Sequence, residues 1–152
     1  MDTRLIGQIP GHMAFDKEQA GQSYPPHMLA FLGDAVFGLY IRTYVAAGGE
    51  KASGRLHELS AELVRASSQA VMIRGIMGEL SPEERAVYKK GRNANTTSHA
   101  KHATMSEYHQ ATGLEALFGY LYLEGEEERM SFLVGRCIEA YKSHEAGETK
   151  NE

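Results

Sequence analysis

The chain has 152 residues, of which 24% are charged and 42% are hydrophobic, and its formal net charge is −4. This length accommodates one domain of ordinary size, and the composition excludes intrinsic disorder and fibrous repeats for the chain as a whole. The single cysteine, Cys137, excludes an internal disulfide and a cysteine-rich zinc site, which favours a reducing compartment, and we expect a cytoplasmic protein.

Five helices are expected, because apolar residues recur at three-and-four spacing and no segment alternates like a strand. Residues 1–24 mix glycine, proline and polar residues, lack the pattern of a secretion signal and form an irregular lead-in. The expected helices span residues 25–48, 53–78, 81–90, 106–123 and 126–144, with a loop at 91–104 and a frayed tail at 146–152. The prediction is one all-α domain at residues 25–145, without a membrane span.

Residues suited to helix ends support these boundaries. Pro25 and Pro26 suit a helix start, and Gly48 suits a helix stop. Ser81 precedes Pro82 and two acids, which is typical of the first turn of a helix. The second helix is predicted to be continuous, because its apolar stripe keeps its spacing through Leu56, Leu59, Leu63, Ala66, Ala70, Ile73 and Met77.

Long windows in two of the expected helices contain a single acid where the composition predicts several charged residues. From residue 25 to residue 41 the only charged side chain is Asp34, and from 110 to 123 it is Glu115. A carboxylate on an apolar helix needs a cation, a hydrogen-bond network or an opening to solvent. If the helices pack together, both acids can share a divalent cation, and oxygen ligands without cysteine favour Mg²⁺ or Mn²⁺.

A structural alternative stays open, in which each acid forms a salt bridge with an arginine of another helix, such as Arg65 or Arg74. Glycines in the two helices favour the close packing that a shared site needs, since a glycine inside a helix costs about 0.5–1 kcal/mol. They are Gly33, Gly38, Gly113 and Gly119. Small residues tolerated in a tight core explain them equally well.

Positive charge gathers in residues 89–102, which read KKGRNANTTSHAKH and include four basic residues and no acid. Since the whole chain nets −4, the rest nets −8, and attraction for phosphate is concentrated here. The short polar side chains suit the sugar hydroxyls and phosphates of duplex RNA, and the absence of aromatic residues argues against a single-strand platform. The candidate RNA-binding residues are Lys89, Lys90, Arg92, Asn93, Asn95, Thr97 and Lys101. A solvated polar loop is the alternative.

Other sequence patterns are weaker evidence for a functional site. His57 and Glu58 begin a zinc-hydrolase pattern, HExxH, but position 61 is alanine, so the second histidine is missing. Glu58 and Glu62 are interpreted as a solvated helix face, and their use as metal ligands in an all-α nucleotide pyrophosphohydrolase is a remote functional alternative. Cys137 is expected to be a small buried hydrophobe.

The segments around the two acids resemble a known family. LAFLGDAVFGLYIR, residues 29–42, is similar to the signature helix of the ribonuclease III family, and TGLEALFGYLYLE, residues 112–124, is similar to its second acidic helix. KKGRNANTTSHAK followed by EALFGYLYLE resembles Mini-ribonuclease III, which consists of the nuclease domain alone. The resemblance covers residues 25 to about 137, and the chain leaves no space for a double-stranded-RNA-binding domain.

The resemblance implies a homodimeric, Mg²⁺-dependent endoribonuclease, with Mn²⁺ as a substitute, that cuts double-stranded RNA and leaves 5′-phosphate and 3′-hydroxyl ends. For the Mini form it implies maturation of 23S ribosomal RNA precursor in the cytoplasm. Asp34 and Glu115 match the family's catalytic, metal-binding acids. The larger enzymes have further acids where this chain has His27, Ala30 and Thr112, so fewer protein ligands would hold the metal. A non-catalytic RNA-binding module of the same fold is the principal alternative.

Overall fold

The computed structural model describes residues 24–94 and 104–150, and these residues form helices and their connections without any strand. The helices are α1 (Pro26–Ala47), α2 (Ser53–Val64), α3 (Ala66–Ile76), the 3-10 turn η4 (Met77–Glu79), α4 (Pro82–Arg92), α5 (Met105–Glu124) and α6 (Glu127–Lys150). The all-α prediction is confirmed, and α6 continues beyond its expected end at residue 144.

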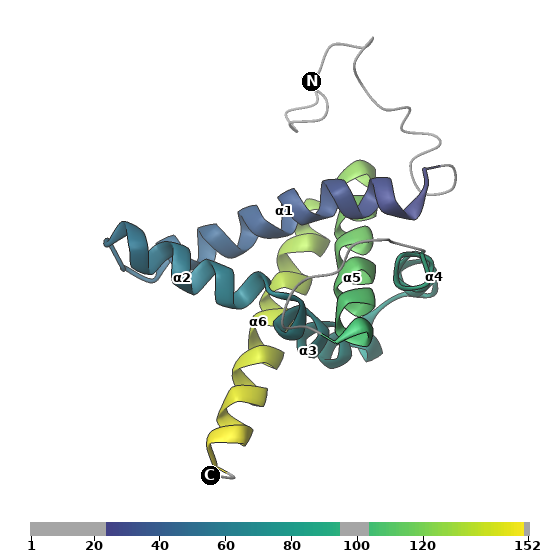
Figure 1. Cartoon of the computed structure of the whole chain (residues 1–152). Helices are drawn as coiled ribbons and strands as arrows, with labels where there is room; N and C mark the ends of the chain where they lie inside the picture. Colours follow the sequence, from purple (N-terminus) through teal and green to yellow (C-terminus); the bar gives the residue numbers. More distant parts are fainter. Residues whose placement is uncertain (1–23, 95–103, 151–152) are drawn as a thin grey trace, which may run out of the picture.

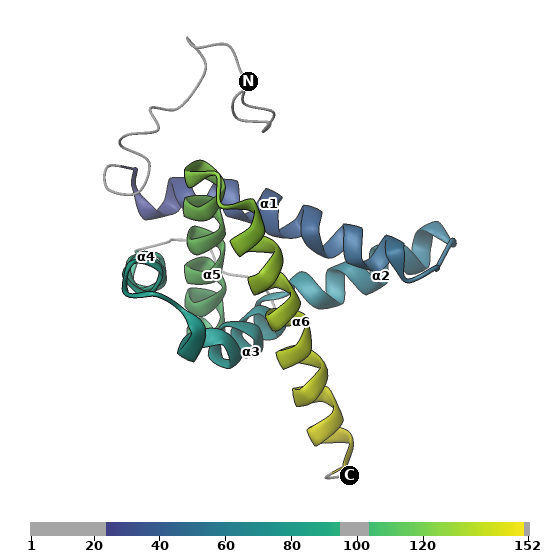
Figure 2. The same ribbon diagram turned by 180° about the vertical axis from the view of Figure 1, so that it is seen from behind.

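Helix α5 lies at the centre of the fold, with α1 crossing it and α4, α3 and α6 packed around it (Figure 1). Helix α2 turns back beneath the second half of α1. Seen from behind, the first half of α6 covers the centre, while its second half extends away from the other helices (Figure 2).

The core forms where the apolar faces of α1, α3, α5 and α6 meet. Phe37 and Phe118 join α1 to α5 through an edge-to-face ring contact with centroids 5.1 Å apart. Cys137 of α6 is completely buried in this core, and burial raises the pKa of its thiol to about 12. The prediction that Cys137 is a small buried hydrophobe is confirmed.

The predicted second helix is wrong in one respect, because it is broken at Arg65 into α2 and α3. Arg65 has extended backbone angles, φ −66° and ψ 156°. Two side chains beyond the break satisfy carbonyl groups before it: Ser68 Oγ donates to Glu62 at 2.7 Å, and Gln69 Nε2 donates to Val64 at 2.6 Å. Without glycine or proline at the break, the apolar spacing gave no sign of it.

Capping residues fix the starts of α4 and α5. Ser81 accepts a hydrogen bond from the backbone of Glu84, whose carboxylate accepts one from the backbone of Ser81. Thr104 and Glu107 form the same reciprocal pair at the start of α5. The predicted start of α4 is therefore confirmed.

Helix α1 is long and apolar enough to cross a membrane, with a mean hydropathy of 1.3 over an 18-residue window. The expectation that no uncharged stretch is long enough for a span still holds, because Asp34 interrupts the apolar run. Helix α1 meets the criterion for a membrane span because Asp34 is its only charged residue before Arg42. In this fold α1 packs along α5, so its apolar character belongs to a core helix.

Candidate metal and RNA-binding site

Helices α1 and α5 meet backbone to backbone, and this contact positions both lone acids. A Cβ atom on Gly33 would overlap the carbonyl group of Glu115, and one on Gly119 would overlap that of Leu29. Asp34 directly follows Gly33, so the crossing that requires glycine also brings Asp34 to Glu115. The predicted role in close packing is confirmed for Gly33 and Gly119.

The other two glycines differ from each other. A Cβ atom on Gly113 would lie 2.6 Å from the ring of Tyr88, so this glycine allows α4 to pack closely against α5. A Cβ atom on Gly38 would meet nothing within 4 Å. The packing prediction is therefore wrong for Gly38, which lines an open cleft beside Asp34.

The two acids have unequal environments. Asp34 is exposed, whereas Glu115 is half-buried on the inner side of the crossing. The pKa of Glu115 is raised to about 8, first by burial and then by the negative charge of Asp34, while hydrogen bonding with the Gln69 side chain opposes the rise. The structure thus brings Asp34 and Glu115 close enough to repel each other, as expected for a site completed by a cation.

Each acid lines its own cleft, and the two clefts share a wall. Glu115 lies in a cleft of about 900 Å³ with Thr112 and Gln69. Asp34 lies in a cleft of about 630 Å³. Ala61 and Val64 line both clefts, so the last turn of α2 separates them. An extended ligand can therefore contact both acids while lying across the end of α2.

The structural alternative, a salt bridge from each acid to an arginine, is not observed. Among residues 24–94 and 104–148, every ion pair joins side chains other than Asp34 and Glu115. Arg65 lines the cleft of Glu115, but no basic residue contributes to the pKa shift of Glu115. Arg74 is exposed, and its positive charge contributes to the pKa shifts of Tyr88 and Glu107 instead.

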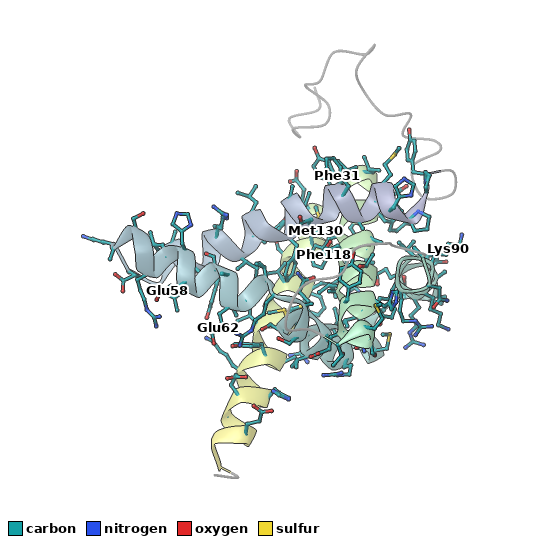
Figure 3. All side chains as sticks on the ribbon, viewed as in Figure 1. Phe31, Glu58, Glu62, Lys90, Phe118 and Met130 are labelled. Carbon is teal, nitrogen blue, oxygen red and sulfur yellow. The ribbon has the colours of Figure 1, made fainter. Side chains whose placement is uncertain are left out.

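Glu58 and Glu62 already have structural partners. Glu58 forms an exposed ion pair with Arg55 at 3.3 Å. Glu62 accepts a hydrogen bond from the hydroxyl of Tyr141 at 2.7 Å, and burial together with Glu62 raises the pKa of Tyr141 to about 12. Both glutamates lie on α2 in Figure 3, and these contacts give them roles other than metal ligation.

The structure describes four of the seven predicted RNA-binding residues. Lys89, Lys90 and Asn93 are exposed at the end of α4. Arg92 is half-buried, with its guanidinium 5.6 Å from the centre of the Tyr88 ring and its Nε donating to Asn93 at 3.2 Å. The remaining candidates, Asn95, Thr97 and Lys101, lie outside the described residues.

The basic end of α4 lies beside the part of α5 that holds Glu115. A Cβ atom on Gly91 would lie 2.6 Å from Ala116 and 3.3 Å from the carbonyl oxygen of Thr112. Lys90 is on the outer side of α4 in Figure 3, facing away from α5. The lysines at this end of α4 are therefore placed to contact the flank of a long ligand rather than the acids themselves.

The chemistry of the acid site fits a divalent cation. Asp34 and Glu115 offer carboxylate oxygens, and a positive charge between them would offset both the burial of Glu115 and the repulsion from Asp34. Where the larger enzymes of the resembled family have further acids, Thr112 is buried with its hydroxyl bonded to the Tyr108 carbonyl at 3.0 Å. Asp34 and Glu115 could hold a cation here, with water as further ligands.

Another group of possible metal ligands among the described residues is His144, Glu145 and Glu148, whose ligand atoms lie within 4.8 Å of one another. All three are exposed on the outer part of α6. Exposed acids on a helix are common without a metal, so this group adds no argument for a site.

Several residues around the acids were not singled out from the sequence as functional. Gln69 is completely buried beside Glu115, and Arg42 and His57 line the cleft of Asp34. Gln69 had a detectable signal, because it lies three residues after Ala66 and four before Ile73 on an apolar stripe. Arg42 had none, and His57 was considered only for an incomplete zinc pattern, since only the packing of α1 against α2 brings the two residues together.

Comparisons with known proteins agree with this arrangement. Residues 27–126 match the Ribonuclease III domain family. A Mini-ribonuclease 3 from Thermoanaerobacter is 43% identical over 139 residues, covering 91% of this chain and 97% of that protein. One from Clostridium tetani is 37% identical over 127 residues, covering 83% of this chain and 84% of that protein.

A solved structure shows the same fold. The crystal structure of a protein from Fusobacterium nucleatum superposes with a TM-score of 0.70 at 31% sequence identity, covering 78% of this chain and 94% of that chain.

Proposed function

The chain belongs to the ribonuclease III family, as a Mini-ribonuclease III with endoribonuclease activity on RNA, and on this basis we propose that it is a Mg²⁺-dependent enzyme with its active site at Asp34 and Glu115. The observation that supports this site is the electrostatic coupling of the two acids at the glycine crossing of α1 and α5. Members of this family act on double-stranded RNA and depend on a metal.

The carboxylates of Asp34 and Glu115 would hold the ion, Mg²⁺ or its substitute Mn²⁺. When bound, such an ion lowers the pKa of a coordinated water and offsets negative charge on the phosphate. The protein supplies the geometry, because the backbone contact at Gly33 fixes Asp34 relative to Glu115. The expected products are 5′-phosphate and 3′-hydroxyl ends.

The basic end of α4 would hold the RNA backbone. Lys89 and Lys90 are exposed there without an acid within the adjoining segment 89–102, which favours contact with phosphate. The remaining proposed contacts are Arg92, Asn93, Asn95, Thr97 and Lys101. We propose 23S ribosomal RNA precursor as the substrate and the cytoplasm as the site of action, as the resemblance to Mini-ribonuclease III implies.

An exposed apolar face on α1 supports a homodimer. Phe31 is 78% exposed and Leu39 is 66% exposed, although both are large apolar residues. Leu39 lines an apolar cleft of about 470 Å³ together with Val36, Tyr122 and Met130. Phe31 forms a ridge on the same helix, and the cleft forms a groove. A surface with a ridge and a groove can pair with a second copy of itself about a two-fold axis, so Phe31 of each copy would enter the groove of the other. Figure 3 shows Phe31 on the outer side of α1.

Cleavage of a duplex RNA by the purified protein tests the proposed function. Wild-type protein is expected to cut in Mg²⁺ and not in EDTA, and Asp34→Asn is expected to abolish cleavage while RNA binding survives. Binding without cleavage by the wild type would support the non-catalytic RNA-binding module instead. Full activity of Asp34→Asn would remove Asp34 from the mechanism.

A nucleotide assay addresses the remaining alternative. A pyrophosphohydrolase would turn over free nucleotides and would lose that activity in Glu62→Gln rather than in Glu115→Gln. Because Glu62 is bonded to Tyr141, we expect no nucleotide turnover by either the wild type or the variants.

A further inference from the structure

Gln69 of α3 is a buried polar residue, and its side-chain oxygen has no hydrogen-bond partner among the described residues. Only 2% of Gln69 is exposed. Its Nε2 atom donates to the carbonyl oxygen of Val64 at 2.6 Å, but no group in the described part of the chain donates to its Oε1 atom. A buried polar atom without a partner costs about 1–3 kcal/mol, so a physical reason is needed for this orientation of the amide.

The neighbours of the amide supply the reason. The carbonyl of Val64 accepts hydrogen bonds and cannot donate them, and the ionised carboxylate of Glu115 has the same restriction. Gln69 and Glu115 line the same cleft, and the Gln69 side chain favours the ionised form of Glu115, which lowers its pKa. Rotating the amide by 180° would turn its oxygen toward the Val64 carbonyl, so the NH₂ group faces the acceptors and Oε1 remains unpaired.

We propose that Gln69 is a positioning residue of the metal site: its amide NH₂ group links the Glu115 carboxylate to the Val64 carbonyl and so holds Glu115 in the orientation that faces Asp34. This inference rests on the proposed function, since it takes Glu115 to be a metal ligand. Gln69 acts through Glu115 and does not touch the ion or the RNA.

The anchor of this link is the break between α2 and α3. Because the backbone is extended at Arg65, the carbonyl of Val64 accepts from the Gln69 side chain instead of a helical N–H. Val64 also lines both clefts, so the anchor adjoins the cleft of each acid. The break that interrupts the predicted second helix therefore frees the Val64 carbonyl at the end of α2, and through Gln69 this carbonyl orients Glu115, the proposed metal ligand on α5.

The substitution Gln69→Met tests the proposal, because methionine has a similar length and lacks the NH₂ group. Mn²⁺ titrated into the protein without RNA and followed by electron paramagnetic resonance gives the metal affinity directly. We expect Gln69→Met to bind Mn²⁺ about 10–100-fold more weakly than the wild type, the range observed when residues that orient metal ligands are replaced. In cleavage assays at fixed Mg²⁺, kcat should fall while KM for duplex RNA stays unchanged.

Ser68→Ala is the matched control. Ser68 is the other side chain that stabilises the break, since its hydroxyl donates to the Glu62 carbonyl at 2.7 Å, and it is 3% exposed. It does not contribute to the pKa shift of Glu115. A loss of metal affinity caused only by loosening the break would appear in Ser68→Ala as well, whereas positioning of Glu115 predicts a wild-type Mn²⁺ affinity for Ser68→Ala.

A second variant covers the case in which Gln69→Met does not fold, as judged by circular dichroism and thermal melting. Gln69→Asn keeps an amide but is one methylene shorter, so it cannot reach Val64 and Glu115 together, and it should show the same loss of Mn²⁺ affinity. Wild-type affinity in a folded Gln69 variant, or an equal loss in Ser68→Ala, would overturn the inference. If the wild type itself binds no Mn²⁺, the proposed function fails first, and the role of Gln69 falls with it.

Discussion

At the scale of single residues, Glu115 is the described carboxylate whose pKa is shifted furthest from its ordinary value. Burial and the charge of Asp34 both favour its protonated form and raise its pKa to about 8. In the unfolded chain its pKa returns to about 4.5. A divalent ion must therefore displace a proton from Glu115 near neutral pH, and metal affinity should rise as the pH rises.

The same shift predicts how the metal-free protein responds to pH. Below pH 4.5 Glu115 is protonated in both states, and between pH 4.5 and 8 only the folded protein keeps the proton. The free energy of unfolding should therefore fall as the pH rises through this window, by at most about 1.4 kcal/mol per pH unit. Thermal melting in EDTA from pH 5 to 8 measures the slope.

Glu115→Gln is the control for this measurement, since it removes the titration while keeping the shape of the side chain. The variant should lose the downward slope over pH 5–8. Cys137 and Tyr141, with pKa values of about 12, stay protonated throughout this range and do not contribute. Parallel curves for the wild type and Glu115→Gln would show that Glu115 does not hold a proton in the folded protein.

At the scale of elements, the crossing of α1 and α5 determines whether a site exists. Gly33 and Gly119 bring the two backbones together, and neither position has room for a Cβ atom. Backbone atoms cannot rotate away as a side chain can, so a methyl group at Gly33 must separate the helices. Separation would also draw Asp34 away from Glu115.

Two glycine substitutions on α1 should therefore have opposite effects. Gly33→Ala should destabilise the fold by about 1–3 kcal/mol or more, the cost of overpacking a close contact. Gly38→Ala meets no atom within 4 Å and should stabilise the helix by about 0.5–1 kcal/mol. Urea denaturation gives both values, and equal effects of the two substitutions would refute the crossing as described.

A separate prediction concerns the binding of RNA at the basic end of α4. If Lys90 contacts a phosphate, Lys90→Ala should weaken duplex RNA binding and reduce the slope of log affinity against log salt by about one. Arg85→Ala is a matched control, because Arg85 is exposed on the same helix but lies nearer its acidic start. Filter binding at several salt concentrations measures both slopes, and an unchanged slope for Lys90→Ala would move the RNA surface elsewhere.

Sequence patterns predicted those features that depend on local chemistry. Asp34 and Glu115 were visible because each is the only charged residue in a long apolar window of its helix, and the start of α4 was visible because Ser81 and Glu84 suit a capping box. The break at Arg65 was missed because side chains three and four residues beyond it stabilise it, and these bonds exist only in the folded state.

At the scale of the whole molecule, the exposed face of α1 predicts the oligomeric state. Phe31→Glu places a charge on the ridge that we propose to enter the partner's groove, and it should convert a dimer into a monomer. Met105→Glu is the control, since Met105 is also an exposed large apolar residue, 54% exposed, at the start of α5. Light scattering after gel filtration gives the mass of each variant. A monomeric wild type, or dimers for both variants, would exclude this face as the interface.

The position of a bound ion tests the central claim most directly. Crystals grown with Mn²⁺ and measured near the manganese absorption edge would give an anomalous difference peak at each bound ion. We expect a peak in contact with carboxylate oxygens of both Asp34 and Glu115. A map with no peak between these two acids, or with a peak only at His144 and Glu148, would contradict the account.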